Sequence, residues 1–224
     1  ANIKLSSVLS DVFGATGTKI MNHVFACEDY RPEELLQYVH GRVKATRAEI
    51  MEALTGYITP HHRFMLKKIL ENIGRIECTI REVDAQIEAC IEPYKVEREL
   101  LETIPGVHKE SATRIIAEIG VDMSQFPDQN HLASWAGVCP GSNETAGKNK
   151  SGRITHGNKY LRSLLVESGW AASRTKNTYM SAKYKSLVGR RGKKKAIIAV
   201  GHKILIATYF ILRDKIEYKE LGPD

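Results

Sequence analysis

The segment from Gly137 to Arg162 reads GVCPGSNETAGKNKSGRITHGNKYLR and places a polar, glycine-rich loop directly before a helix. Its five glycines permit positive φ and a close approach of the backbone to a ligand, and hydroxyls and cations lie between them. Asn158 is a favourable N-cap for a helix whose apolar positions begin at Tyr160 and Leu161. Such a loop is chemically suited to phosphate, although the same composition is also typical of a solvated surface loop.

The sequence around this loop is dominated by helical patterns, which predict a mainly α fold. The residues up to Tyr30 read as a helical segment interrupted by glycines, and Trp135 is expected to enter the core beside the loop. We expect a helical and coiled-coil region over residues 1–96 and a compact helical domain over residues 97–224. The predicted helices cover residues 33–39, 43–54, 60–92, 131–136, 158–174, 177–188 (with Asn177 as N-cap) and 193–212.

One long helix is expected between the turn at Thr59-Pro60 and Pro93. Its apolar residues recur at steps of four and three, which form a narrow heptad stripe: Met65, Ile69, Ile73, Ile76, Ile80, Val83, Ile87 and Cys90. A coiled coil with a second copy explains this stripe, so we expect a homodimer or higher homo-oligomer through residues 60–92. A long helix packed against its own chain is the alternative.

The segment ELLETIPGVHKESATRIIAEIG, residues 99–120, resembles a helix-hairpin-helix in which Pro105-Gly106 forms the turn. In that motif the backbone N–H groups of the hairpin and the following helix N-terminus bind a DNA phosphate without reading sequence. The residues expected to do so here are Gly106, Val107, His108 and Lys109. A hairpin of two helices that only packs is the alternative.

Charge is distributed unevenly along the chain of 224 residues, whose net charge is +7. Residues 137–224 carry 18 Lys and Arg against 6 Asp and Glu, whereas residues 1–136 have a balance of −5. Five cations fall between residues 190 and 195: Arg190, Arg191, Lys193, Lys194 and Lys195. A charge run is usually a solvated face, but in so basic a region it favours contacts with a nucleic-acid backbone.

Several other kinds of site are not supported by the sequence. The four cysteines form no CxxC pair and read as reduced, buried thiols, and the adjacent His61 and His62 cannot share a helical face as metal ligands. The basic half contains few carboxylates, so we expect no metal site there. The apolar stretch 196–212 carries His202 and Lys203 and is better explained as a core helix than as a membrane span.

Four blocks of the sequence together resemble the prokaryotic insertion-sequence transposases: LSSVLSDVFGATG, LLETIPGVHKESATRIIAEIG, FPDQNHLASWAGVCPGSNETAGKNKSGRITHGNKYLR and RGKKKAIIAVGHKILIATYFILRD. Members of that family combine a RuvC-like DEDD domain, a helical middle and a serine-bearing transposase domain, and a structured bridge RNA guides them. The resemblance implies that this chain is the helical middle and C-terminal domain of such a protein. The RuvC-like domain, with the Mg²⁺ expected there, would be missing, and no cofactor is expected in this chain.

The resemblance also implies roles for residues of the loop. The family's nucleophilic serine lies in a segment like N-E-S-A-G-K, which here reads Asn143-Glu144-Thr145-Ala146-Gly147-Lys148, so Thr145 stands where the serine is expected. A threonine hydroxyl can attack phosphorus, but its β-methyl group crowds the approach. Ser142 and Ser151 are nearby hydroxyls outside the motif position. Lys148 and Arg153 would stabilise the transferring phosphate, while Gly147, Lys150, Asn158 and Arg162 would hold the strand.

The expected function is therefore that of a DNA transposase or recombinase in the full-length parent, with the fragment alone inactive. Its expected partners are DNA, a structured guide RNA and further copies of itself, but no membrane. Its expected location is the prokaryotic cytoplasm, associated with the nucleoid. A non-catalytic nucleic-acid-binding helical scaffold is the first alternative. A purely structural coiled-coil protein is the second, and would bind nucleic acid weakly with little dependence on salt.

Overall fold

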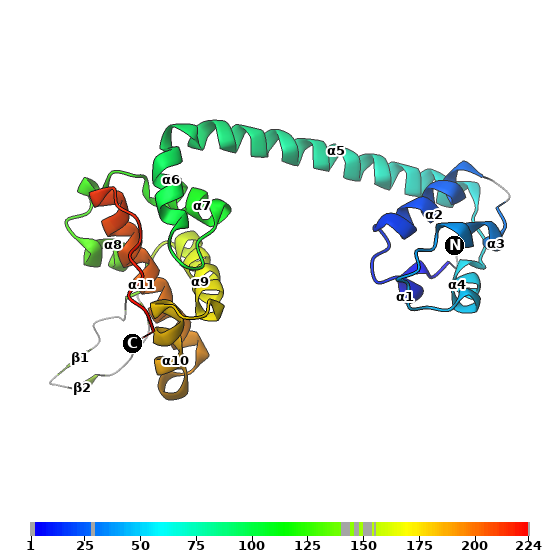
Figure 1. Ribbon diagram of the computed structural model, residues 1–224. Helices are drawn as coiled ribbons and strands as arrows, with labels where there is room; N and C mark the ends of the chain where they lie inside the picture. The colour runs from blue at the N-terminus through cyan, green and yellow to red at the C-terminus, as the bar shows by residue number, and fades with distance from the viewer. Residues whose placement is uncertain are drawn as a thin grey trace. The chain divides into compact units, whose positions relative to one another are not determined.

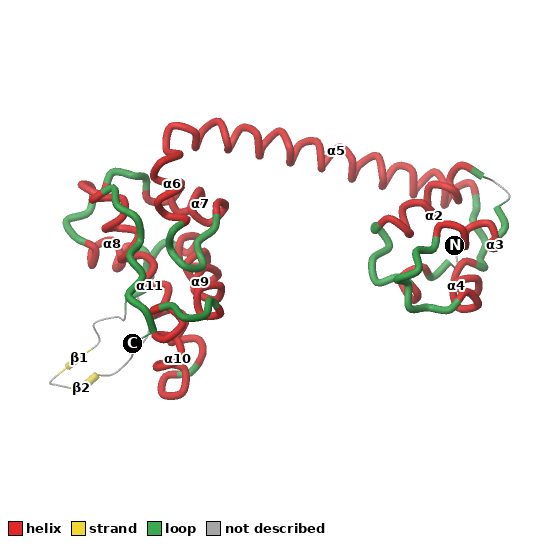
Figure 2. Tube along the Cα trace, viewed as in Figure 1, coloured by secondary structure: helices red, strands yellow, loops and turns green. Residues whose placement is uncertain are grey.

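The computed structural model describes residues 3–27, 30–139, 144–145, 148–149, 154 and 156–223. The chain divides into two compact units, Ala1–Gln86 and Ile87–Asp224, and helices dominate both (Figures 1 and 2). The mainly α fold class is thereby confirmed. Among the described residues, the strands are the short pair β1 (Glu144–Thr145) and β2 (Lys148–Asn149).

The first unit is a small helical core followed by the start of a long helix. It contains α1 (Leu5–Val8), α2 (Ala15–Ala26), α3 (Pro32–Leu35), the 3₁₀ turn η1 (Leu36–Tyr38) and α4 (Arg47–Leu54). Ile20, Leu35, Ile50 and Leu54 are almost fully buried in its core. Helix α4 begins later than the sequence pattern predicts, because Thr46 and Glu49 form a capping box that fixes its first turn.

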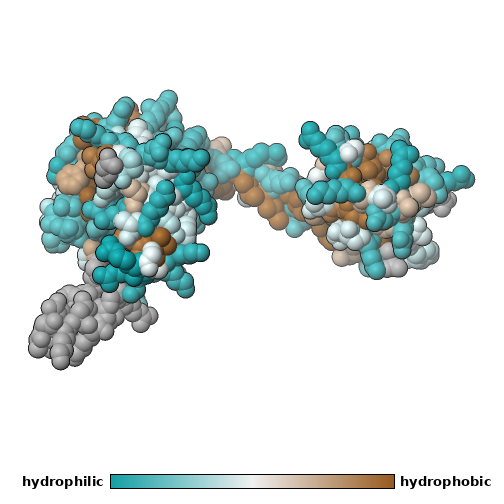
Figure 3. Space-filling view, turned by 60° about the horizontal axis from the view of Figure 1, so that its bottom comes forward, coloured by the Kyte–Doolittle hydropathy of each residue, from teal (hydrophilic) through white to brown (hydrophobic). Residues whose placement is uncertain are grey.

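The long helix predicted before Pro93 is present as α5 (Pro60–Ile91), which spans 32 residues. Most of the heptad stripe is open to solvent among the described residues: Met65, Ile69, Ile76, Ile80, Val83 and Ile87 are 44–52% exposed. Figure 3 shows hydrophobic residues along the middle of this helix. The cysteines Cys78 and Cys90 are also exposed, so the expectation of buried thiols is wrong for these two.

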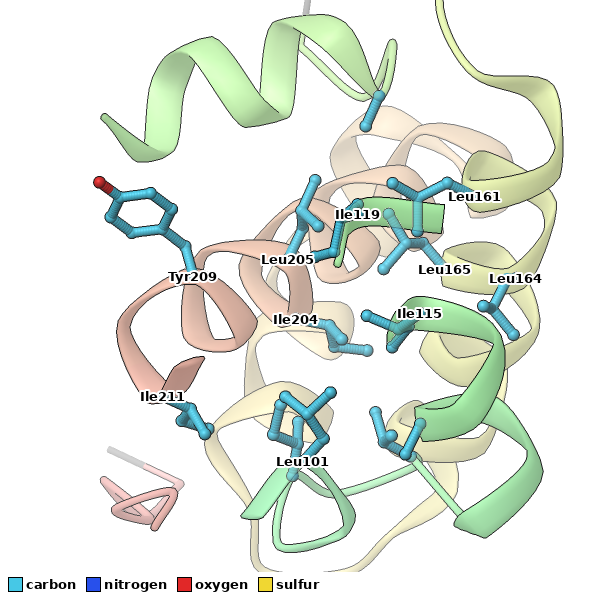
Figure 4. Packing of buried hydrophobic residues seen from close by; sticks show 14 of the residues in the cluster. Leu101, Ile115, Ile119, Leu161, Leu164, Leu165, Ile204, Leu205, Tyr209 and Ile211 are labelled. Atoms are coloured by element: carbon cyan, nitrogen blue, oxygen red, sulfur yellow. The ribbon is translucent and has the colours of Figure 1, made fainter. Parts of the chain in front are cut away.

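The second unit packs its helices around one central helix. After η2 (Glu92–Tyr94) come α6 (Lys95–Glu102), α7 (Lys109–Ile119), η3 (Met123–Gln125), α8 (Gln129–Trp135), α9 (Lys159–Arg174), α10 (Tyr179–Arg191) and α11 (Lys193–Asp214). Helix α11 contacts α6, α8, α9 and α10. Figure 4 shows Leu101, Ile115, Leu165 and Ile204 converging on this core from α6, α7, α9 and α11.

Helices α9 and α11 cross closely because both carry glycine at the contact. A Cβ atom on Gly201 would lie 3.1 Å from the Leu165 carbonyl oxygen, and one on Gly169 would lie 3.3 Å from that of Ile197. Among the described residues, α11 is the one helix long and apolar enough to cross a membrane by length and composition alone. Within its most apolar 18-residue window, 56% is buried inside the protein, as in the core helix of a soluble domain.

Helix α10 differs at both ends from its prediction. Asn177 is not its N-cap: it adopts φ of 57°, and Thr178 caps the helix by accepting a hydrogen bond from the N–H of Ser181. The helix also continues through Gly189 to Arg191, since only Gly192, at φ of 77°, breaks the run. Helix caps are decided by backbone conformation, and two adjacent capping residues cannot be ranked by type alone.

The C-terminal segment, residues 215–223, runs across the second unit and joins three of its elements. The Lys215 ammonium bonds to the Glu97 carboxylate of α6 at 2.6 Å, and the Tyr218 N–H donates to Thr103 Oγ1 at 2.9 Å. The Glu220 carboxylate accepts the N–H of Tyr179, at the start of α10, at 2.7 Å. Burial raises the pKa of Tyr218 to about 12, since its ring packs against the hydrophobic core.

Candidate nucleic-acid interface

The glycine-rich loop leaves the second unit at the end of α8. Gly137 has φ of 69° and occupies the C′ position of a Schellman motif. The N–H of Val138 donates to the Ala133 carbonyl at 3.2 Å, and the N–H of Gly137 donates to Ser134 at 3.0 Å. This turn directs the chain out of the helix, while Val138 itself is only 3% exposed. The start of the loop is therefore anchored in the core.

The loop returns to the same point at Gly157. A Cβ atom on Gly157 would lie 2.4 Å from the nitrogen of Gly137 and 2.6 Å from the carbonyl oxygen of Trp135. Any side chain there would overlap backbone that cannot move aside, so the crossing requires glycine. The two ends of the loop are in van der Waals contact, and this crossing of Gly137 and Gly157 closes its base.

Asn158 connects the closed base to the helices around it. Its Oδ1 atom accepts the N–H groups of Tyr160 and Leu161 at 2.9 and 3.0 Å, which confirms the predicted N-cap of α9. Its Nδ2 atom donates to the Glu118 carboxylate of α7 at 2.6 Å, and its own N–H donates to the Trp135 carbonyl at 3.1 Å. The residue predicted to hold a strand is thus engaged with three elements of its own unit, α9 and α7 through its side chain and α8 through its backbone N–H.

Within the loop, the structure pairs two of the predicted catalytic residues. Strands β1 and β2 are antiparallel, with Thr145 opposite Lys148 and Glu144 opposite Asn149. The backbone pairing brings the expected nucleophile position and a lysine together. The other predicted loop residues lie outside the described residues: Gly147, Lys150, Arg153, Ser142 and Ser151.

The predicted cationic run lies at the junction of α10 and α11. Arg190 and Arg191 end α10, and Lys193 to Lys195 form the first turn of α11, with Gly192 between them. All five side chains are exposed, and none makes an ion pair with another described residue. The carboxylates that neutralise cations elsewhere in the described unit are absent here. Arg162, one turn into α9, is partly buried.

The predicted hairpin joins α6 and α7, but two of its four candidate residues face the protein's own core. Gly106 has φ of 85°, and a Cβ atom on it would lie 2.4 Å from the Ser168 carbonyl oxygen of α9. Val107 is 2% exposed, and its N–H donates to Ile104 at 3.0 Å. His108 and Lys109 are exposed, and Lys109 forms an ion pair with Glu88 at 3.0 Å. This packing favours the alternative, a hairpin of two helices that only packs against the core.

Titratable groups near the loop are few. Burial raises the pKa of the Cys139 thiol, which makes this cysteine a poor thiolate nucleophile at neutral pH. His156, near the other end of the loop, is exposed. In the part of the chain that the structure describes, no group of three His, Cys, Asp or Glu side chains could hold a metal ion.

Two aromatic side chains at the base of the loop are more exposed than the sequence predicts. Trp135 was expected in the core but is 44% exposed, because Leu132 and Ala133 supply the buried face of α8. Its ring makes a tilted contact with Phe126 at 6.0 Å. Tyr160, in the first turn of α9, is 63% exposed, and the Lys159 ammonium lies 5.1 Å from the centre of its ring.

Sequence patterns do not identify the residues that hold this site together. Glu118 and Trp135 contact Asn158 from 40 and 23 positions away along the chain, and the crossing joins Gly137 and Gly157, which are 20 positions apart. Nothing in local composition identifies such partners. The signal that existed was the pair of glycines placed at either end of a long polar segment, where positive φ or a close approach is usual.

Comparison with known proteins finds a similarity to a transposase domain in the region of this site. Residues 98–185 match the sequence model of the transposase IS116/IS110/IS902 family, a region that runs from α6 through the loop into α10. The part of the chain that carries the candidate interface is thus similar in sequence to the transposase domain of that family.

Particular relatives extend the similarity to 64% of the chain. A pilin gene-inverting protein of Moraxella lacunata is 31% identical over 150 residues, and the protein of that name from Moraxella bovis is equally similar; the match covers 46% of each relative. An uncharacterized 43.6 kDa protein of insertion element IS110 from Streptomyces coelicolor is 27% identical over 147 residues, which cover 35% of it. The chain thus spans less than half the length of these relatives.

Proposed function

We propose that this chain acts as part of a DNA transposase or recombinase that moves or inverts a DNA segment. The observation that carries this proposal is the match of residues 98–185 to a transposase domain, because this region contains the closed loop and its flanking helices. Names of relatives that refer to gene inversion and to an insertion element support the same class of reaction. The basic junction of α10 and α11 supplies the charge that binding to a polyanion requires.

The proposed reaction is a transesterification at Thr145. Its hydroxyl oxygen attacks a DNA phosphorus and gives up its proton to water, and a threonine–phosphate ester forms. The phosphorus–oxygen bond to the departing sugar breaks, and that sugar oxygen takes up a proton. Lys148, paired with Thr145 across β1 and β2, is proposed to neutralise the phosphate together with Arg153, while Gly147, Lys150 and Arg162 hold the strand. No step is assigned to a metal ion on this chain.

The remaining parts of the proposal concern partners. We assign complete activity to a protein that includes this chain together with a separate metal-binding, RuvC-like domain, guided by a structured RNA. We further propose that α5 pairs with α5 of a second copy through its exposed heptad stripe, and that the protein works in the cytoplasm, on the nucleoid. Family resemblance supports the RNA and the additional domain, while the exposure of the stripe supports the pairing.

Trapping of a covalent protein–DNA adduct tests the catalytic role of Thr145. The full-length protein would be incubated with radiolabelled DNA and its guide RNA, and the adduct counted after denaturing electrophoresis. The Thr145→Ser variant should give more adduct, because it removes the crowding β-methyl group, and Thr145→Ala should give none. Ser142→Ala is the matched control and should leave the yield unchanged. An adduct that survives in Thr145→Ala would refute the assignment.

A non-catalytic nucleic-acid-binding scaffold remains the second candidate, because threonine stands where the resemblance expects serine. This candidate predicts binding to DNA without any adduct for either the threonine or the serine protein. The salt dependence of binding then distinguishes it from a purely structural protein, since a protein that contacts several phosphates loses affinity steeply as salt rises.

A further inference from the structure

The base of the closed loop presents two large aromatic side chains that the core does not use. Trp135 ends α8 and Tyr160 lies in the first turn of α9, and they are 44% and 63% exposed. Asn158 lies between them: its N–H donates to the Trp135 carbonyl at 3.1 Å, and its Oδ1 atom accepts the N–H of Tyr160 at 2.9 Å. The same hydrogen-bonded group therefore fixes the backbone that carries both rings.

Packing does not explain the exposure of these rings. Leu132 and Ala133 of α8 are fully buried, as is Leu161 of α9, so each helix already has its apolar anchors at this point. The Trp135 ring is supported from one direction by Phe126, at a ring separation of 6.0 Å, and still leaves nearly half of its surface open. A supported and partly open ring loses little side-chain freedom when a flat ligand stacks on it.

One of the two rings carries a cation. The Lys159 ammonium lies 5.1 Å from the centre of the Tyr160 ring, and Arg162 lies in the same part of α9. Exposed aromatic rings beside lysine and arginine are the combination by which proteins bind unpaired nucleotides: the cations contact the phosphates, and the rings stack on the bases. Bases inside a duplex cannot stack in this way, because both of their faces are already covered by neighbouring pairs.

We propose that Trp135 and Tyr160 are stacking platforms for unpaired nucleobases at the base of the loop. The inference rests on the proposed function, because it assumes that a nucleic-acid strand reaches the loop. It adds that the bases of this strand are unpaired next to the attacked phosphate. The bases are those of a single strand of DNA or RNA, since both present the same stacking face.

Fluorescence anisotropy with labelled oligonucleotides tests this proposal on the whole chain. Four ligands of equal length are compared: oligo-dT, oligo-rU, a strand of abasic deoxyribose units and a DNA duplex. The abasic strand retains the phosphates and lacks the bases, so its affinity relative to that of oligo-dT measures stacking. Wild-type protein should bind oligo-dT about ten times more tightly than the abasic strand. Equal affinity for oligo-rU and oligo-dT would indicate that stacking does not depend on the sugar. A higher affinity for one of them would identify the strand that binds the two rings as RNA or DNA.

Substitutions at the two rings provide the decisive comparison. Trp135→Ala and Tyr160→Leu should each reduce the preference for oligo-dT over the abasic strand several-fold, and their duplex affinity should stay within twofold of wild type. Tyr57→Ala is the matched control, since Tyr57 is a 76% exposed aromatic residue of the first unit. Thermal unfolding confirms that each variant is folded, and Tyr160→Leu keeps the test valid if Trp135→Ala unfolds through the loss of its contact with Phe126.

The possible outcomes separate this inference from the proposed function. An unchanged preference for oligo-dT in both ring variants would overturn the stacking proposal, as would a wild-type protein that binds the abasic strand as tightly as oligo-dT. The proposed function would survive either result, provided that duplex or abasic DNA is bound in a salt-dependent manner. A wild-type protein that binds none of the four ligands would contradict both, and would indicate that the exposed rings serve a protein partner.

Discussion

Asn158 is one side chain with two separate structural roles. Its oxygen caps α9, and its amide nitrogen bonds to Glu118 of α7 at 2.6 Å. Replacement by alanine removes the cap, which is worth about 1 kcal/mol, and leaves the Glu118 carboxylate without its donor. We expect Asn158→Ala to lower the free energy of unfolding of the second unit by about 2 kcal/mol, measured by urea titration.

The two roles can be separated by neighbouring substitutions. Asn158→Ser retains a capping oxygen and loses only the contact with Glu118. It should therefore lower the free energy of unfolding about half as much as Asn158→Ala does. Glu118→Ala loses the same contact from the other side and should cost about as much as the serine variant. If Asn158→Ala were no more destabilising than Glu118→Ala, the cap would contribute nothing, and the two-role description would be wrong.

The cap was predictable from sequence, and the contact with Glu118 was not. Asn158 directly precedes an apolar helical pattern, and a side chain that bonds to N–H groups two and three residues ahead is a local feature. Glu118 reaches it only because α7 and α9 pack together. The exposure of Trp135 was mispredicted for the same reason: a tryptophan in a short helix is usually buried, and its environment depends on which other residues fill the core.

Among the elements, the segment of residues 215–223 offers a test with a defined pH dependence. The hydrogen bond from Lys215 holds the pKa of the Glu97 carboxyl below its ordinary value. A carboxyl with a lowered pKa in the folded protein stabilises it at pH values above the ordinary pKa of about 4.5. This contribution of Glu97 to stability disappears as the pH falls from about 4.5 through the lowered pKa of its carboxyl group.

Lys215→Ala should therefore lower the unfolding temperature at pH 7 and have progressively less effect between pH 4.5 and pH 3. Differential scanning calorimetry across this range provides the measurement. Lys219→Ala is the control, since Lys219 is an exposed lysine of the same segment that forms no ion pair with a described residue. An effect of Lys215→Ala that is constant down to pH 3 would exclude the Glu97 contact as its cause.

The helices themselves were well predicted where their patterns were long, and poorly at their ends. The 32 residues of α5 follow from the heptad spacing and the flanking prolines. The end of α10 is predicted too early because Gly189 and Gly192 both resemble helix breakers, while only Gly192 adopts a conformation that ends the helix. A Cβ atom on Gly189 would meet no neighbouring atom within 4 Å, so packing does not require this glycine, and it lies inside the helix at a modest cost in stability.

At the scale of the whole molecule, the open stripe on α5 predicts self-association. Ile69, Ile76, Ile80 and Ile87 expose about half of their surface on one face of the helix, an arrangement that pairing with a second α5 would bury. Ile76→Glu introduces a charge into this face and should convert a dimer into a monomer, as measured by sedimentation equilibrium. Ala85→Glu adds the same charge to an exposed position outside the stripe and should leave the dimer intact.

A wild-type protein that remains monomeric at tens of micromolar would contradict this prediction. The pattern could be recognised in the sequence because heptad spacing needs no tertiary information. The sequence alone does not give the exposure of the stripe, which the structure shows for the residues that it describes.

Because the backbones of Gly137 and Gly157 cross, the segment between them begins and ends at the same point of the fold. Helices α8 and α9 are joined through this crossing and through Asn158. Their packing therefore does not depend on the identity of the residues in the middle of the intervening segment. A residue between the two glycines, such as Thr145, can therefore be exchanged for another in evolution without a change in the scaffold that presents it.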